Sequence, residues 1–238
     1  MSLEPWPLFW LLLTVGAYAC SRYLYRRTGR YLLSPLMLVP ALLLVLAVPL
    51  RTSYAEYTSN AHFLTLMLGP CMVAFAIPVW QQRAMLARHW LPLLLGMVVG
   101  SVVSIVSSWL LAGLFSLDAD ISYSLLPHSV FSPIAMPLAG NIGGVPELAS
   151  VFVMATGVFG AAAGSVLLRW IPMRTALARG TLFGVSAHGA GVSRAREFGN
   201  QEGAVAGLAM VLTGLLNLLL APLLALLLQA PAARQIIG

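Results

Sequence analysis

Apolar and polar positions along this chain are grouped in long blocks rather than alternating with a short period. Short polar segments separate apolar runs at residues 6–20, 31–50, 61–80, 90–117, 148–170 and 203–228. A helix needs about 20 predominantly apolar residues to cross the hydrocarbon core of a bilayer. The pattern therefore predicts an all-α polytopic membrane protein with about seven transmembrane helices.

Two more apolar segments, 127–146 and 180–202, are interrupted by helix-breaking residues. The first contains Pro127, Pro133 and Pro137, and the second is rich in glycine. Proline removes a backbone donor and clashes with the preceding turn of a helix. Broken backbone at membrane depth survives only where protein buries it or where it lines a wet cavity. We therefore expect two discontinuous or re-entrant segments.

Composition and charge agree with a membrane location and give an orientation. The chain is 60% hydrophobic and only 8% charged, whereas about 25% of the residues of a soluble domain are charged. All thirteen Lys/Arg residues are arginines; most lie at 22–30, 81–89 and 169–179, while the loops at 51–60 and 118–126 carry almost none and hold acids. The positive-inside rule makes the arginine loops cytoplasmic and puts the N-terminus outside, in a bacterial inner membrane. The arginines are not interleaved with aromatic residues, so nucleic-acid binding is not expected.

This topology brings the two broken segments in from opposite faces. Each contains a histidine, two hydroxyls and a helix breaker, which would suit an inverted repeat with halves starting near residues 90 and 152. Paired broken segments mark a transport site at the bilayer midplane, and helix N-termini facing such a site favour an anion. We therefore predict an elevator- or rocking-type carrier, with residues 1–89 as a scaffold for oligomerisation and residues 90–238 as the transport unit.

The polar and small residues of the two broken segments are the candidate ligands of the substrate. His188 is the main candidate for a coupled proton and His128 the second, because histidine titrates near physiological pH. The expected substrate-binding residues are Ser129, Ser132, Pro133, Asn141, Gly143, Gly144, Ser186, His188, Gly191, Ser193 and Arg194.

Several charged and hydroxyl residues have a plainer interpretation. Arg194 is either an ordinary cytoplasmic arginine or a ligand whose planar fork matches a carboxylate. Glu202 is expected to pair with Arg194 or Arg196. Ser101, Ser104, Ser107 and Ser108 recur with glycine at helical spacing, which is typical of packing between helices. No GxSxG, HExxH, Walker A or metal-spaced Cys/His pattern is present, so we expect no enzyme activity, metal or cofactor.

Segments 126–136, 142–146, 179–195 and 202–212 resemble the LrgB/CidB family of bacterial membrane proteins, and 34–36 and 68–78 do so more weakly. The family usually reads Lys-Ser-Val-Thr-Thr-Pro where this chain has the segment His128 to Pro133. Its second break is similar to Gly-Thr-Ala-Ser-His-Ala-Ile-Gly-Thr-Ala-Arg. His188, Gly191 and Arg194 keep that pattern, but the hydroxyl positions differ.

The resemblance implies two rival functions. One branch of the family includes the plastid glycolate/glycerate transporter and bacterial relatives tied to pyruvate-type monocarboxylates. The other tradition describes holin/antiholin-like regulators of murein hydrolase export and lysis, acting with an LrgA/CidA-type membrane partner. The paired breaks favour a monocarboxylate transporter, with the regulator as the first alternative and a purely structural partner of an LrgA-like protein as the second. A homodimer is expected through the N-terminal spans.

Overall fold

The computed structural model describes residues 5–30, 33–53, 56–57, 59, 62–74 and 76–229. All regular structure in these residues is helical, as the apolar pattern predicts. The chain divides into two compact units, Met1–Ala74 and Phe75–Gly238. The sequence predicts the boundary between the two parts at residue 89. In the structure this residue lies within the helix Arg83–Leu114, which belongs wholly to the second unit.

The first unit contains α1 (Pro5–Thr28), α2 (Pro35–Ala47), α4 (His62–Leu66) and α5 (Leu68–Ala74). Trp10 of α1 is buried and packs edge-on against the ring of Tyr57. The Ser21 hydroxyl donates a hydrogen bond of 2.8 Å to the backbone oxygen of Leu33, which fixes the start of α2 against α1.

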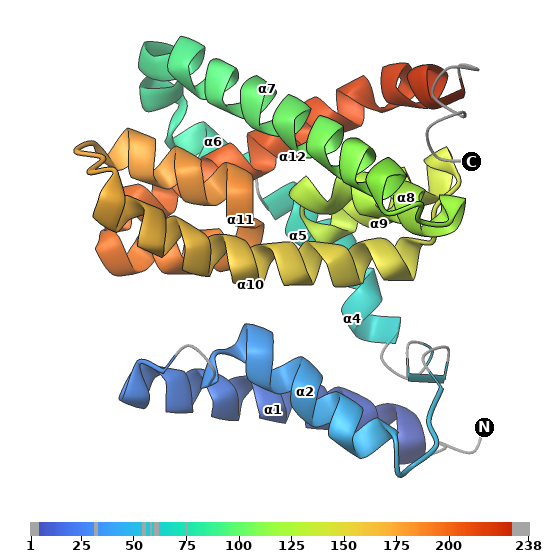
Figure 1. The fold of residues 1–238 in the computed structure, drawn as a ribbon. Coiled ribbons are helices and arrows are strands. Elements are labelled where there is room, and N and C mark those ends of the chain that lie inside the picture. Colours follow the sequence, from blue (N-terminus) through green and yellow to red (C-terminus); the bar gives the residue numbers. More distant parts are fainter. Residues whose placement is uncertain are drawn as a thin grey trace. The chain divides into compact units, whose positions relative to one another are not determined.

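The second unit is built on three long helices, with shorter elements between them (Figure 1). Its elements are α6 (Ala76–Gln81), α7 (Arg83–Leu114), α8 (Ala119–Leu125), the 3-10 turn η2 (Leu126–Ser129), α9 (Ser132–Ile142), α10 (Pro146–Trp170), α11 (Ala176–Phe198) and α12 (Asn200–Gln229).

Local chemistry explains where these elements begin and end. Proline stands at the start of both α9 and α10, where its missing N–H costs nothing. Gly143 ends α9 in the left-handed region, with φ of 97°. The Gly144 N–H then reaches back to the Ala139 carbonyl over 2.8 Å, as in a Schellman-type stop. The Thr175 hydroxyl caps α11 by accepting from the Ala178 N–H over 3.2 Å.

The core of the second unit joins α7, α11 and α12. Its buried members include Leu93 and Met97 from α7, Val185 from α11 and Leu208 from α12. Small residues permit this close packing: a Cβ on Gly100 would lie 2.5 Å from Val185. Close approach through glycine is typical of helices that pack within membranes.

Three helices are long and apolar enough to cross a membrane among the described residues: Arg83–Leu114, Pro146–Trp170 and Asn200–Leu223. Met37–Ala47 is apolar but shorter. In the predicted third span, residues 61–80, the described helices α4, α5 and α6 are each short. The predicted count of seven transmembrane helices is therefore not confirmed, and neither is the inverted repeat.

Candidate functional site

The first broken segment folds into a hairpin. The chain descends through α8 and η2, passes through extended backbone at Val130 and Phe131, and returns as α9. The base is closed because the Val145 N–H donates to the Ser124 hydroxyl over 2.7 Å. Gly144 sits so close there that a Cβ on it would lie 2.6 Å from the Ser124 nitrogen. We call residues 119–145 the first hairpin and residues 128–132 its tip.

The second broken segment is also a hairpin, because α11 consists of two helical arms that meet at a kink. Its backbone turns at His188, with φ of 44° and ψ of −128°. In a straight helix Phe183 and Phe198 would lie roughly 22 Å apart, yet their rings stack with centroids 5.6 Å apart. Gly191 likewise lies directly against the Phe183 carbonyl oxygen. We call residues 176–198 the second hairpin and residues 187–190 its tip. The interrupted backbone predicted at both segments is thus confirmed.

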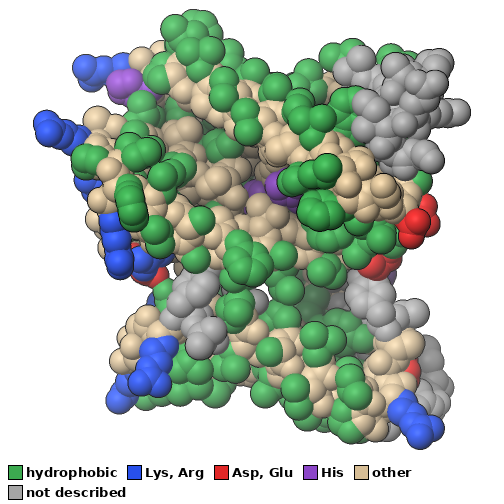
Figure 2. Space-filling model, viewed as in Figure 1, with side chains coloured by type: hydrophobic (Ala, Val, Ile, Leu, Met, Phe, Trp, Pro, Cys, Tyr) green, Lys and Arg blue, Asp and Glu red, His purple; other side chains and the backbone are tan. Residues whose placement is uncertain are grey.

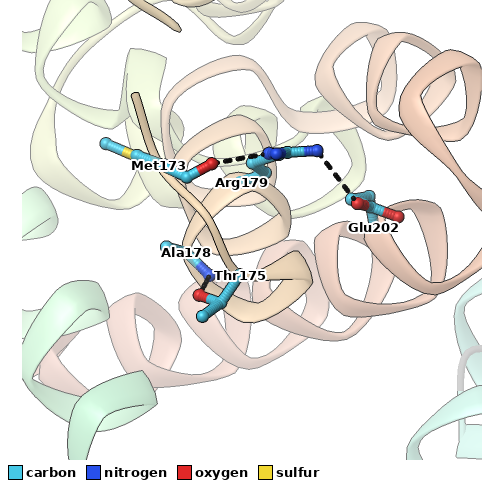
Figure 3. Close-up of polar contacts among 5 residues, drawn as sticks. All are labelled: Met173, Thr175, Ala178, Arg179 and Glu202. Atoms are coloured by element: carbon cyan, nitrogen blue, oxygen red, sulfur yellow. Dashed lines mark hydrogen bonds and ion pairs between the residues drawn. The ribbon is translucent and has the colours of Figure 1, made fainter. Parts of the chain in front are cut away.

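The base of the second hairpin is held by an arginine and a glutamate (Figure 3). Arg179 pairs with Glu202 across 3.5 Å and also donates to the Met173 backbone oxygen over 2.8 Å. The expectation that Glu202 pairs with Arg194 or Arg196 is wrong: the reversal at His188 returns the chain to Arg179. One side chain thereby ties the loop before the hairpin to the start of α12.

Both tips rest on the same stretch of α10. His128 Nδ1 lies 3.0 Å from the Thr156 hydroxyl. A Cβ on Gly157 would lie 3.4 Å from Ala190 Cβ, and one on Gly160 would lie 2.7 Å from the Ser186 backbone oxygen.

This stretch of α10 is its middle. Val158 is the central residue of Pro146–Trp170, about 18 Å from either end. The first hairpin leads into the start of α10 and the second follows its end, so the hairpins approach from opposite ends (Figure 1). Their tips meet at mid-depth, where the Ser129 backbone lies beside the His188 ring.

Two other long helices add polar groups at the same depth. From α7, the Ser104 hydroxyl lies 3.0 Å from His128 Nε2, so the His128 ring bridges α7 and α10. From α12, the Asn217 amide donates to the Ser101 hydroxyl over 2.8 Å, and both side chains are buried. The His128 ring at the first tip therefore lies between two neutral hydroxyls, and Ser101 lies about one helical turn from one of them on α7.

Several polar atoms at the tips have no hydrogen-bond partner. Both ring nitrogens of His188 and the hydroxyl of Ser129 are buried, and none of them makes a hydrogen bond of good geometry. The two residues are only 4% and 6% exposed. A buried donor or acceptor without a partner costs roughly 1–3 kcal/mol, and more where no water reaches it. These unpaired polar atoms lie next to the N-terminus of α9 and to the start of the returning arm of the second hairpin, which is the part of α11 after His188. They are suited to bind a polar ligand.

Neither hairpin has the surface of a lipid-facing helix. The long helices expose large apolar side chains such as Val103, Phe159 and Leu219, whereas the two hairpins expose such side chains only at their last residues, Val145 and Phe198. Figure 2 shows a hollow on one face of the second unit with a histidine side chain at its edge. The hairpins are therefore lined for contact with protein, water or a small polar molecule.

The structure brings together some of the predicted binding residues. Ser129 and His188 meet at the tips, with Ser132 and Pro133 at the start of α9 and partly exposed. Gly191 packs against the opposite arm of its own hairpin. The exposed residues Ser186 and Ser193 line the second hairpin.

Other predicted residues lie apart from the tips. Asn141 and Gly143 end α9, roughly 13.5 Å of helix from Ser132, and Gly144 closes the base of the first hairpin. Arg194 Nε donates to the Ser165 hydroxyl over 2.8 Å.

The other partners of Arg194 also keep it away from the tips. Its guanidinium pairs with Glu197 and lies over the Phe198 ring. Ser165 is nine residues beyond Thr156 on α10, or roughly 13.5 Å along the axis. Arg194 therefore ties the second hairpin to α10 outside the layer that contains His128.

Sequence reasoning missed the partners supplied by the long helices. Ser104 was expected to be a packing residue, and Thr156 and Asn217 drew no prediction. The only available signal was a hydroxyl or amide in the middle of an apolar helix, where polar groups usually find a partner on another helix. Ser101 does lie between helices, as expected for packing.

Three helices that are long and apolar enough to cross a membrane indicate a helical membrane protein. The chain belongs to the LrgB-like family, whose model matches residues 14–227, and the family resemblance is confirmed. The uncharacterized protein YwbG of Bacillus subtilis (strain 168) is 37% identical over 214 residues, covering 90% of this chain and 95% of that protein. The antiholin-like protein LrgB of the same organism is 30% identical over 217 residues, covering 91% and 94%. No solved structure matches.

Proposed function

We propose that this chain is a secondary transporter of a small monocarboxylate of the glycolate, glycerate, lactate or pyruvate type. The observation that carries the proposal is the meeting of two hairpins, from opposite ends of α10, at the middle of that helix. A solute held there is equally far from both ends of the helix. Alternating access needs a site of this kind, which either face can reach in turn.

The charges and dipoles at the tips favour weak binding of an anion. α9 and the returning arm of the second hairpin both begin at the tips, and helix N-termini attract negative charge. Arg194 is engaged elsewhere, by Ser165 and Glu197. Neutral donors bind a carboxylate less tightly than a fixed arginine would, which helps release.

His188 and His128 are the candidates for a coupled proton. Carrying one elementary charge across a membrane costs about 2.3 kcal/mol per 100 mV, and a proton that travels with a monoanion removes this cost. The hydroxyls of Ser104 and Thr156 can each donate or accept. His128 can therefore change protonation state while keeping both contacts.

The orientation follows the arginines. With the loops at 22–30, 81–89 and 169–179 in the cytoplasm, the N-terminus lies outside an inner membrane. The first hairpin then enters from outside and the second from the cytoplasm. We propose that the hairpin unit moves against the N-terminal helices by an elevator or rocking motion, and that these helices form a homodimer.

A second candidate is an antiholin-like regulator of murein hydrolase export that acts with an LrgA/CidA-type partner. The names of several relatives support it, including the antiholin-like LrgB proteins of Bacillus subtilis and Bacillus mycoides. The hairpin tips favour the carrier, because a protein that opens lesions by self-assembly does not need them.

The test is uptake of labelled glycolate, lactate and pyruvate into proteoliposomes, with and without a proton gradient. We compare the wild type with Ser129→Ala and His188→Asn, since asparagine tolerates positive φ better than most residues. Ser165→Ala serves as the control, because it changes a hydroxyl on α10 away from the tips.

The carrier predicts saturable uptake that falls at least tenfold in the two tip variants and is kept in the control. Unsaturable leakage of dyes and many solutes would support the lytic regulator instead. Activity or stability that depends entirely on a co-reconstituted LrgA-type protein would assign this chain a structural role.

A further inference from the structure

The exposed face of the second hairpin has an unusual lining for an apolar chain. Its exposed residues include Ser186, Gly189 and Ser193, and no large apolar side chain is exposed between residues 172 and 197. Lipid rewards large apolar side chains and leaves backbone polar groups unsatisfied. This face is therefore suited to water or to a bound solute.

Gly189 is the one position at the second tip with free space above it. A Cβ built on Gly189 meets nothing within 4 Å, whereas a Cβ on Gly191 meets the opposite arm. The residues on either side of Gly189 are fixed: His188 is buried, and Ala190 packs on Gly157 of α10. Gly189 is thus held in place by its two neighbours and has empty space on its exposed side.

Gly189 directly follows in the chain one of the groups that would hold an anion. The returning arm begins at Gly189, and the N–H groups of a first helical turn have no partner within the helix. The unpaired His188 ring precedes it in the chain, and the Ser129 backbone lies beside that ring. A carboxylate on these donors would place its carbon substituents over Gly189.

We propose that Gly189 is the residue that limits substrate size, an inference that rests on the proposed carrier function. Its missing side chain leaves room for the methyl group that lactate has and glycolate lacks. The methyl group of an alanine at position 189 would occupy the same space. Discrimination by a single methyl-sized group is worth about 10- to 200-fold, so Gly189→Ala should raise the preference for glycolate over lactate by about tenfold or more.

The experiment measures glycolate and lactate uptake in proteoliposomes for the wild type, Gly189→Ala and Gly189→Val. Gly16→Ala is the matched control, because Gly16 also lies in a helix with nothing within 4 Å of an added Cβ, but in the first unit. The inference expects lactate uptake to fall stepwise from Gly to Ala to Val, glycolate uptake to fall less, and the control to keep the wild-type ratio.

A thiol probe provides a readout that does not need transport. Gly189→Cys, with Cys20 and Cys71 changed to serine, is treated with a charged methanethiosulfonate reagent, which reacts only where water reaches. We expect reaction, slowed by glycolate. A thiol that reacts only with a lipid-soluble maleimide would overturn the inference.

An unchanged glycolate-to-lactate ratio in both Gly189 variants, with wild-type uptake intact, would overturn the inference and leave the carrier standing. Absence of carboxylate uptake by the wild type would remove the proposed function and the inference together.

Discussion

Two glycines of the second hairpin give opposite predictions for the same substitution. At Gly191 an added Cβ would press on the Phe183 carbonyl oxygen and lie 2.7 Å from the Phe183 carbonyl carbon and 2.9 Å from Ala187 Cβ. The Phe183 atoms belong to the backbone and cannot rotate away. At Gly189 the space is empty, and φ is outside the left-handed region at both glycines.

The free energies follow from these distances. Overpacking a fixed site costs about 1–3 kcal/mol, so Gly191→Ala should destabilise the fold by that amount. Alanine in place of glycine at an unstrained helical position stabilises by about 0.5–1 kcal/mol, so Gly189→Ala should be neutral or stabilising. The two variants should differ by about 3 kcal/mol, or roughly 6–12 °C in Tm for a chain of this size.

The assay is thermal unfolding of the purified chain in detergent, followed by tryptophan fluorescence, which can report the exposure of the buried Trp10. Both alanine variants are measured beside the wild type under one condition. A straight α11 would bring neither glycine near Phe183, and both substitutions would then stabilise the protein. Equal or parallel shifts in Tm would therefore refute the hairpin.

Three further predictions concern the fold around the tips. His188→Gly should be more stable than His188→Ala by about 1 kcal/mol, the reverse of the order in an ordinary helix, because His188 has positive φ; Tm values of the two variants decide it. Exchanging Arg179 and Glu202 should restore part of the stability that either single charge reversal removes, with a coupling of about 0.2–1 kcal/mol because Arg179 is partly exposed; a double-mutant cycle in denaturant with no coupling would contradict the pairing. Asn217→Leu should lower stability by about 0.6–1.7 kcal/mol, the range for hydrogen bonds between membrane helices, and Ser101→Ala by less, since Asn217 keeps its bond to the Thr213 carbonyl.

The sequence predicted the two breaks because their cause is local. Pro133 disfavours helical backbone in the residues before it, and the glycines around His188 permit a reversal, so the break positions could be predicted from local sequence. The three long helices around them could be read equally well from apolar length.

The partners across helices could not be predicted in this way. Whether Ser104 faces His128 or a neighbouring helix depends on how α7 is rotated about its axis, and the apolar pattern of a lipid-exposed helix leaves that rotation open. The pairing of Glu202 failed for a related reason. Nearness along the chain favoured Arg194, but the reversal at His188 carried the chain back to Arg179.

The two hairpins contact neighbouring residues on one side of α10. Thr156 bonds to one tip, while Gly157 and Gly160 receive the other. Because each helical residue advances the rotation by about 100°, one residue inserted between Thr156 and Gly160 would turn these two contact points away from their common direction. The number of residues between them therefore matters as much as their identity, and an insertion or deletion here would separate the contacts of the two hairpins on α10.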